Sequence, residues 1–138
     1  MQVEFWGIFH DGSISNIDSS VQGDLTIDIS IQYIRRQFPG AGDGFKVKLH
    51  NCTRFEYQEY DSQVITDFSV IVAMDPELLS LESASDPIVI NCVMGKLTTS
   101  YSSASVSLNS GEPVSYNDLT TACASYWDAW EANHKSAS

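Results

Sequence analysis

Two pairs of a histidine and a carboxylate are the residues of this sequence whose types could do acid–base chemistry. His10 precedes Asp11 directly, and Asp28 and His50 lie on two segments that we expect to pair. A carboxylate beside an imidazole can orient it as a general base. Neither pair has a recognisable nucleophile, because the sequence has no Gly-x-Ser-x-Gly elbow and its cysteines lack a catalytic signature. We therefore interpret both pairs as surface ion pairs and predict no catalytic residue, with a small hydrolase or transferase as the alternative.

Acidic and aromatic residues alternate in the segment 55–61. A half-buried strand with a solvated acidic face explains the pattern. The same residues also suit a protein-binding face, because tyrosine offers rigid contact area and carboxylates attract a basic partner. We predict that this binding face consists of Glu56, Tyr57, Glu59, Tyr60 and Asp61.

A second aromatic group, Tyr126, Trp127 and Trp130, lies near the C-terminus. Tyr126 and Trp130 share a helical stripe with Leu119 and Cys123, which predicts core packing. Trp127 lies about 100° away from Tyr126 around the helix, at the border of that stripe. This position leaves open a second alternative, a platform for a sugar or another small ligand.

The sequence predicts no metal and no cofactor. Its histidines at 10, 50 and 134 are far apart, and no stretch has the pattern of a calcium loop. The glycine-rich segment 40–44 lacks the lysine of a phosphate-binding loop and precedes a strand. We interpret its glycines as parts of a reversing loop.

Composition restricts the kinds of partner. The chain has 138 residues and a formal net charge of -11, from 18 acidic and 7 basic residues. We expect one domain, 1–138, that does not bind nucleic acid, because too few cations are present to neutralise phosphates. No apolar window is long enough for a membrane helix, and we expect no signal peptide because the first ten residues contain no lysine or arginine. The three widely spaced cysteines predict reduced thiols and a cytoplasmic location.

Apolar and polar residues alternate through most of the chain, which predicts an α+β domain. We expect a mainly antiparallel, twisted sheet of about six to eight strands, with a C-terminal helix packed on one face. The expected strands are 3–9, turning at Asp11-Gly12 into 14–17, then 24–32, 45–50 with 55–57, 87–93, 96–101 and 104–108. The serine-rich strand 104–108 could pair edge to edge with a second copy, so we expect a monomer or a weak homodimer.

The register and the helices complete the expected fold. Pairing of 24–32 with 45–50 is predicted to set Asp28 opposite His50. The segment 64–73 is either a buried strand or a short helix, and Asp75-Pro76-Glu77 predicts a helix start that continues through 78–79. Ser115 and Asp118 approximate a capping box for the C-terminal helix, which we expect to end in a polar, disordered tail at 133–138.

Three segments carry a resemblance to a known class of proteins. They are Phe9–Ile14 (FHDGSI), Asn51–Tyr57 (NCTRFEY) and Tyr126–Trp130 (YWDAW). In these segments and in its general layout, the chain resembles the small, acidic bacterial proteins that are grouped with the immunity proteins of polymorphic toxin systems. The resemblance implies a non-enzymatic cytoplasmic protein that neutralises a toxin, often a basic nuclease, by blocking its surface.

Overall fold

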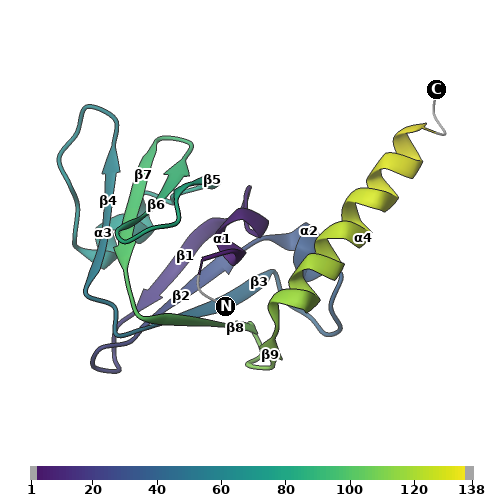
Figure 1. Cartoon of the computed structure of the whole chain (residues 1–138), viewed down its shortest axis with the longest axis horizontal. Coiled ribbons are helices and arrows are strands. Elements are labelled where there is room, and N and C mark those ends of the chain that lie inside the picture. The colour runs from purple at the N-terminus through teal and green to yellow at the C-terminus, as the bar shows by residue number, and fades with distance from the viewer. Residues whose placement is uncertain (1–2, 136–138) are drawn as a thin grey trace.

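The computed structural model describes residues 3–135, which form two antiparallel sheets and four helices (Figure 1). The larger sheet has the order β1 (Ser13–Asp18), β2 (Leu25–Ser30), β3 (Gly44–His50), β8 (Ser103–Leu108) and β9 (Pro113–Val114). The smaller sheet has the order β4 (Arg54–Glu59), β7 (Gly95–Ser100), β6 (Ile88–Cys92) and β5 (Leu78–Ser83). The helices are α1 (Phe5–Ile8), α2 (Gln32–Arg35), α3 (Phe68–Ala73) and α4 (Tyr116–Lys135). The predicted α+β class is confirmed, with the strands divided between two sheets.

The two sheets share one apolar core. Alternation along β2 buries Ile27 and Ile29, and alternation along β3 buries Val47 and Leu49. Residues of the smaller sheet, such as Leu97, belong to the same buried cluster. The outward residues of β2 and β3 are polar, so one face of the larger sheet remains available for charged side chains.

The strands β2 and β3 are antiparallel neighbours, as predicted, but the predicted register is wrong. Asp28 lies opposite Lys46, four residues along β3 from His50. The cause is the connection between the strands: β2 ends at Ser30, and the chain then forms α2 and a loop before Gly44 pairs with Ser30. The inward and outward faces are nevertheless those predicted, because the shift is an even number of residues.

Two segments fold differently from the prediction. The predicted strand 3–9 contains α1. Phe5 and Trp6 in this helix and Phe9 at its C-cap are all buried, a spacing that a helix places on one side. The predicted helix start at 75–77 leads instead into β5. Asp75 has a φ of 51°, and the carbonyl oxygen of Pro76 accepts a bond from the Ile14 amide at 3.0 Å.

The segment 64–73, which the sequence left open between strand and helix, contains the helix α3. Its N-cap is Asp67, whose carboxylate accepts a bond from the Ser69 amide at 3.0 Å. Asp67 therefore has the capping role that the sequence assigned to Asp75.

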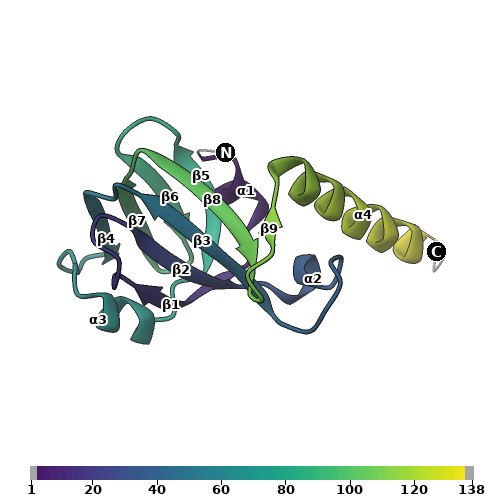
Figure 2. The same cartoon turned by 90° about the horizontal axis from the view of Figure 1, so that it is seen from below.

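The helix α4 begins with the predicted capping box, in which the Asp118 amide donates to Ser115 Oγ at 3.0 Å. Its first turns pack against α1 and α2, and its second half extends away from the sheets (Figures 1 and 2). Trp130, which was predicted to pack in the core, is 44% exposed. The helix includes residues 133–135 of the predicted tail, and 136–138 lie outside the described residues. In the described part of the chain, no helix is both long and apolar enough to cross a membrane.

The serine-rich strand β8 lies inside the larger sheet. It pairs with β3 along its whole length and with β9 at Val106 and Ser107. Val106 and Ser107 are therefore flanked on both sides, whereas β9 does not pair with Ser103, Ala104 or Ser105, and edge-to-edge pairing through this strand stays a prediction.

A buried arginine organises the end of the larger sheet. Arg35 is 1% exposed, and its guanidinium donates to Asn109 Oδ1 at 2.7 Å and to the carbonyl oxygens of Pro39 and Ala41 at 3.1 Å each. A side chain at Gly42 would lie 2.2 Å from the Asn109 amide. This glycine is therefore required by the close approach of Asn109 as well as by turn geometry.

The substitution Asn109→Ala is expected to destabilise the protein. It removes the acceptor of the Arg35 Nε–H, and an unpaired buried donor costs about 1 to 3 kcal/mol. Urea denaturation monitored by tryptophan fluorescence measures the change in the free energy of unfolding. Ser110→Ala, at the neighbouring exposed position, is the control and should change that free energy by less than about 0.5 kcal/mol. Equal stability of the two variants would contradict this role of Asn109.

Candidate functional site

The chain crosses between the two sheets at two adjacent places. Residues 51–53 connect β3 to β4, and 101–102 connect β7 to β8. The Ser102 amide donates to the carbonyl oxygen of His50 at 2.9 Å. The Thr53 amide donates to the carbonyl oxygen of Ser100, also at 2.9 Å. These bonds hold the two crossings together, and we call this region the crossover.

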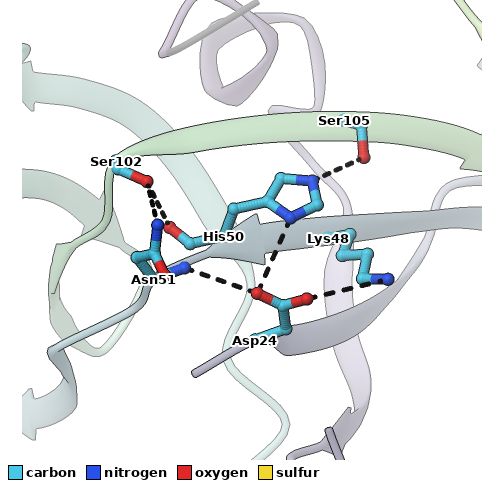
Figure 3. A network of polar contacts seen from close by, with 6 residues as sticks. All are labelled: Asp24, Lys48, His50, Asn51, Ser102 and Ser105. Atoms are coloured by element: carbon cyan, nitrogen blue, oxygen red, sulfur yellow. Dashed lines mark hydrogen bonds and ion pairs between the residues drawn. The ribbon is translucent and has the colours of Figure 1, made fainter. Parts of the chain in front are cut away.

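A network of polar contacts surrounds the crossover (Figure 3). Asp24, directly before β2, lies 3.8 Å from Lys48 Nζ and 3.6 Å from His50 Nδ1. Its carboxylate also accepts a bond from the amide of Asn51, a residue with a φ of 52°. The network therefore fixes the position at which the chain leaves β3, and Lys48 on the outer face of the sheet offsets the charge of the Asp24 carboxylate.

His50 links this network to a serine. Its Nε2 lies 3.4 Å from Ser105 Oγ, so Asp24, His50 and Ser105 follow one another in the order of a catalytic triad. The two spacings are longer than the hydrogen bonds of a working triad. Ser105 lies on a strand of an open sheet face, and neither it nor His50 lines the cavity described below. The arrangement orients an imidazole but does not build a site that encloses an acyl group.

The two predicted pairs of histidine and carboxylate have different outcomes. Asp28 does not meet His50, because the register gives it Lys46 at 3.2 Å instead. His10 Nε2 lies 3.9 Å from Asp11, and its Nδ1 lies 2.9 Å from the Gly7 carbonyl oxygen. The sequence did not indicate Asp24 as the partner of His50. The length of the connection between β2 and β3 sets the register, and the register decides which carboxylate lies near His50.

A cavity of about 420 Å³ opens beside the crossover, and we call it the Phe68 cavity. The apolar residues that line the cavity include the buried Leu25 and Phe55, and Phe68 at the start of α3. The charged residues that line it are Asp24, Arg54 and Glu56. The remaining lining residues are Ser19, Val21, Gly23, Cys52, Thr53 and Thr66.

The five residues of the predicted binding face do not form one surface. Glu56 lines the Phe68 cavity. Tyr57 is 1% exposed and packs in the core, where burial raises the pKa of its hydroxyl. Glu59, Tyr60 and Asp61 line a second cavity of about 210 Å³ at the other end of β4. The alternation that buries Phe55 also buries Tyr57, so the sequence itself contained the signal that separates Tyr57 from the other four.

An exposed apolar group adjoins the second cavity. The Tyr60 amide donates to the carbonyl oxygen of Met94 at 3.1 Å, in the turn between β6 and β7. Tyr60 is 60% exposed, Met94 59% and Val93 44%. We call Glu59, Tyr60, Asp61, Val93 and Met94 together the Tyr60 surface. Its two turn residues were missed because they are far from β4 in the sequence.

The aromatic residues of α4 form a cluster with the N-terminal part of the chain. The Trp127 ring is nearly parallel to the His10 ring at a centroid distance of 6.1 Å, and it meets the Trp130 ring edge-on at 5.9 Å. Tyr33 packs on Tyr126 at 4.5 Å. Trp127 is thus surrounded by aromatic neighbours on several sides, and its use as a ligand platform stays a prediction.

Comparisons of this chain with protein-family models, with curated proteins and with solved structures found no match. Within residues 3–135, no three histidine, cysteine or acidic side chains are grouped so that they could hold a metal ion.

Thiol reactivity should report on the environment of the cavity residue Cys52. Burial raises the pKa of the Cys52 thiol, and it raises that of Cys92 to about 12. Both thiols should therefore react slowly with iodoacetamide at neutral pH, and the rate at Cys52 should rise as the pH is raised toward its pKa. Mass spectrometry of timed digests measures the rates. Alkylation of Cys92, which is fully buried, should require unfolding, and its rapid labelling in the folded protein would contradict the structure.

A fluorophosphonate probe tests the hydrolase alternative directly. Without an enclosed site that stabilises the developing negative charge, Ser105 should not react faster than an ordinary surface serine. We expect equal, background labelling of the wild type and of Ser105→Ala, with a known serine hydrolase labelled in parallel. Labelling of the wild type that disappears in Ser105→Ala would show that the triad-like order is catalytic.

Proposed function

We propose that this protein is a non-catalytic binding protein that engages a basic protein through the Tyr60 surface. The observation that carries the proposal is the cavity at the end of β4, where the carboxylates of Glu59 and Asp61 line the same depression as the exposed Tyr60. A Lys or Arg side chain of a partner suits such a depression, because the carboxylates pair with its charge and the ring packs against it.

The cation that lines the depression is already paired. Lys96 Nζ lies 2.9 Å and 3.2 Å from the two carboxylate oxygens of Glu82 on the neighbouring part of the sheet. This hydrogen bond and the charge of Glu82 raise the pKa of Lys96. Because Glu82 offsets the charge of Lys96, the carboxylates of Glu59 and Asp61 still give the depression a negative charge.

Val93 and Met94 would supply the apolar part of the contact. Protein interfaces concentrate their binding free energy in a few aromatic or large apolar residues that become desolvated, surrounded by polar groups. Tyr60 and Met94 are joined through a backbone hydrogen bond and are both more than half exposed. Methionine adapts its shape to a partner at little cost, which suits a surface of this kind.

The resemblance to immunity proteins supplies the kind of partner. A toxin that binds nucleic acid carries a basic surface, and an acidic protein that covers this surface would block it. The proposal includes a monomer or weak homodimer in the cytoplasm, where the free thiols of Cys52, Cys92 and Cys123 would stay reduced.

Affinity capture with matched variants tests the proposal. The immobilised wild type is compared with a Tyr60→Ser/Met94→Ser double variant, using lysate of the source organism and the purified product of the neighbouring reading frame. We expect the wild type to retain a protein with a basic surface and the double variant to bind it at least about tenfold more weakly by calorimetry, which is about 1.4 kcal/mol. Added salt should weaken the complex, because charge attraction contributes to it.

Val70→Ser is the control, because Val70 is an exposed apolar residue on α3, outside the Tyr60 surface. It should bind the partner like the wild type. If the partner is a toxin, co-expression of the wild type should restore growth and the double variant should not. Capture of acidic proteins only, or equal binding by the double variant, would refute the proposal.

A further inference from the structure

We infer that the Phe68 cavity is a binding site for a small amphipathic amine, a molecule with one ammonium group and an apolar body about the size of an aromatic ring. This site is separate from the Tyr60 surface, because the two cavities share no lining residue. The inference goes beyond the proposed function and rests on the shape, the apolar residues and the charges of the cavity.

The size and the apolar lining set the body of the ligand. A volume of about 420 Å³ lies near the lower end of the range for small-molecule sites. The ring of Phe68 meets the ring of Phe55 edge-on at a centroid distance of 6.0 Å, and Leu25 lies beside them in the lining. Such an edge-to-face pair can extend to a third ring, which would be buried against Phe55 and Leu25.

The carboxylate of Glu56 supplies the main recognition of charge. Its side chain is only 19% exposed, and Oε1 accepts both bonds from Arg54, through Nε at 2.8 Å and through Nη2. The other oxygen, Oε2, accepts no bond from residues 3–135. Oε2 is therefore the oxygen of Glu56 that stays open to an ammonium donor from a ligand, with which it would form a charge-assisted hydrogen bond.

The balance of charge around the cavity selects a cation. Arg54 is its one cationic lining residue, and Arg54 is already paired with Glu56. Asp24 contributes a second carboxylate, which Lys48 offsets at 3.8 Å from outside the lining. The lining itself holds two carboxylates and one cation, so an anion of the same size would meet two carboxylates, whereas an ammonium group can approach the Glu56 oxygen that Arg54 leaves open.

Polar groups of the lining complete the expected site. The hydroxyls of Thr53 and Thr66 belong to exposed residues and can accept bonds from an ammonium group that Glu56 does not fully satisfy. Cys52 would act as an apolar lining residue, because its thiol donates to the carbonyl oxygen of Arg54 at 3.4 Å and stays protonated.

Three probes of nearly equal size test the inference. The ¹⁵N-labelled protein is titrated with 2-phenylethylamine, 2-phenylethanol and 3-phenylpropionate, and amide chemical shifts are followed by NMR. We expect the amine to shift the amides of Cys52, Phe55 and Phe68, and to bind at least about tenfold more tightly than the carboxylate. The neutral alcohol should bind with an intermediate affinity, since it keeps the ring contacts and lacks the charge.

Matched variants separate this site from the Tyr60 surface. Glu56→Gln keeps an acceptor for Arg54 but removes the charge, so it should weaken binding of the amine about tenfold and leave that of the alcohol unchanged. Phe68→Ala should weaken binding of both probes. Glu59→Gln removes a carboxylate of the Tyr60 surface and should leave both affinities at their wild-type values.

Four outcomes would overturn the inference. They are binding of the carboxylate as tight as that of the amine, shifts that map outside the Phe68 cavity, loss of amine binding in Glu59→Gln instead of Glu56→Gln, and no shift with any probe at millimolar concentration. None of these outcomes affects the proposed contact with a basic protein, because that contact uses other residues. Conversely, failure of the affinity capture would leave the amine titration unchanged.

Discussion

The two adjacent crossings of the chain between the sheets are the constraint on which this structure depends. A sandwich of two sheets must pass the chain from one sheet to the other, and each passage removes backbone groups from the regular ladder. Here the amides of Ser102 and Thr53 bond across the crossings, and the Asp24 carboxylate caps the amide of Asn51. The Phe68 cavity opens beside this point and shares Asp24 with it, so the same carboxylate serves the fold and lines a candidate site.

The arginines Arg35 and Arg54 show how burial decides the role of a charge. Arg35 has neutral oxygens around its buried guanidinium, and these bonds hold the loop before β3 against the turn after β8. Its hydrogen-bonding capacity is used inside the protein, which makes it a structural residue. Arg54 lies at a cavity and shares a single carboxylate oxygen of Glu56, so part of that ion pair stays open to a ligand.

Alternation of apolar and polar residues was enough to predict the α+β class and the strands β2, β3, β6, β7 and β8. Helical spacing and a capping box predicted the helix α4. It failed where tertiary contacts override local patterns, as at Asp75, whose φ of 51° ends a helix although its sequence is typical of a start. Of the predicted binding face, Glu59, Tyr60 and Asp61 meet at one cavity, and Glu56 lines another. Met94 and Phe68 lie outside β4 in the sequence. The periodicity of one strand does not predict which residues of other segments pack beside it.

The ion pairs of the lysines and arginines show where the net charge of -11 lies on the surface. Lys46, Lys48 and Lys96 each pair with a carboxylate, and Arg54 does the same. The excess negative charge therefore falls on carboxylates outside these pairs, including Glu59 and Asp61. Glu59 and Asp61 give one cavity its preference for a cation. At the Phe68 cavity both carboxylates belong to ion pairs, and the preference comes from the oxygen of Glu56 that Arg54 leaves open. The apolar parts of the two cavities distinguish their ligands. The Phe68 cavity, at about 420 Å³, has the size of a small-molecule site. The exposed Tyr60 and Met94 bury a large area only against a partner that is itself large.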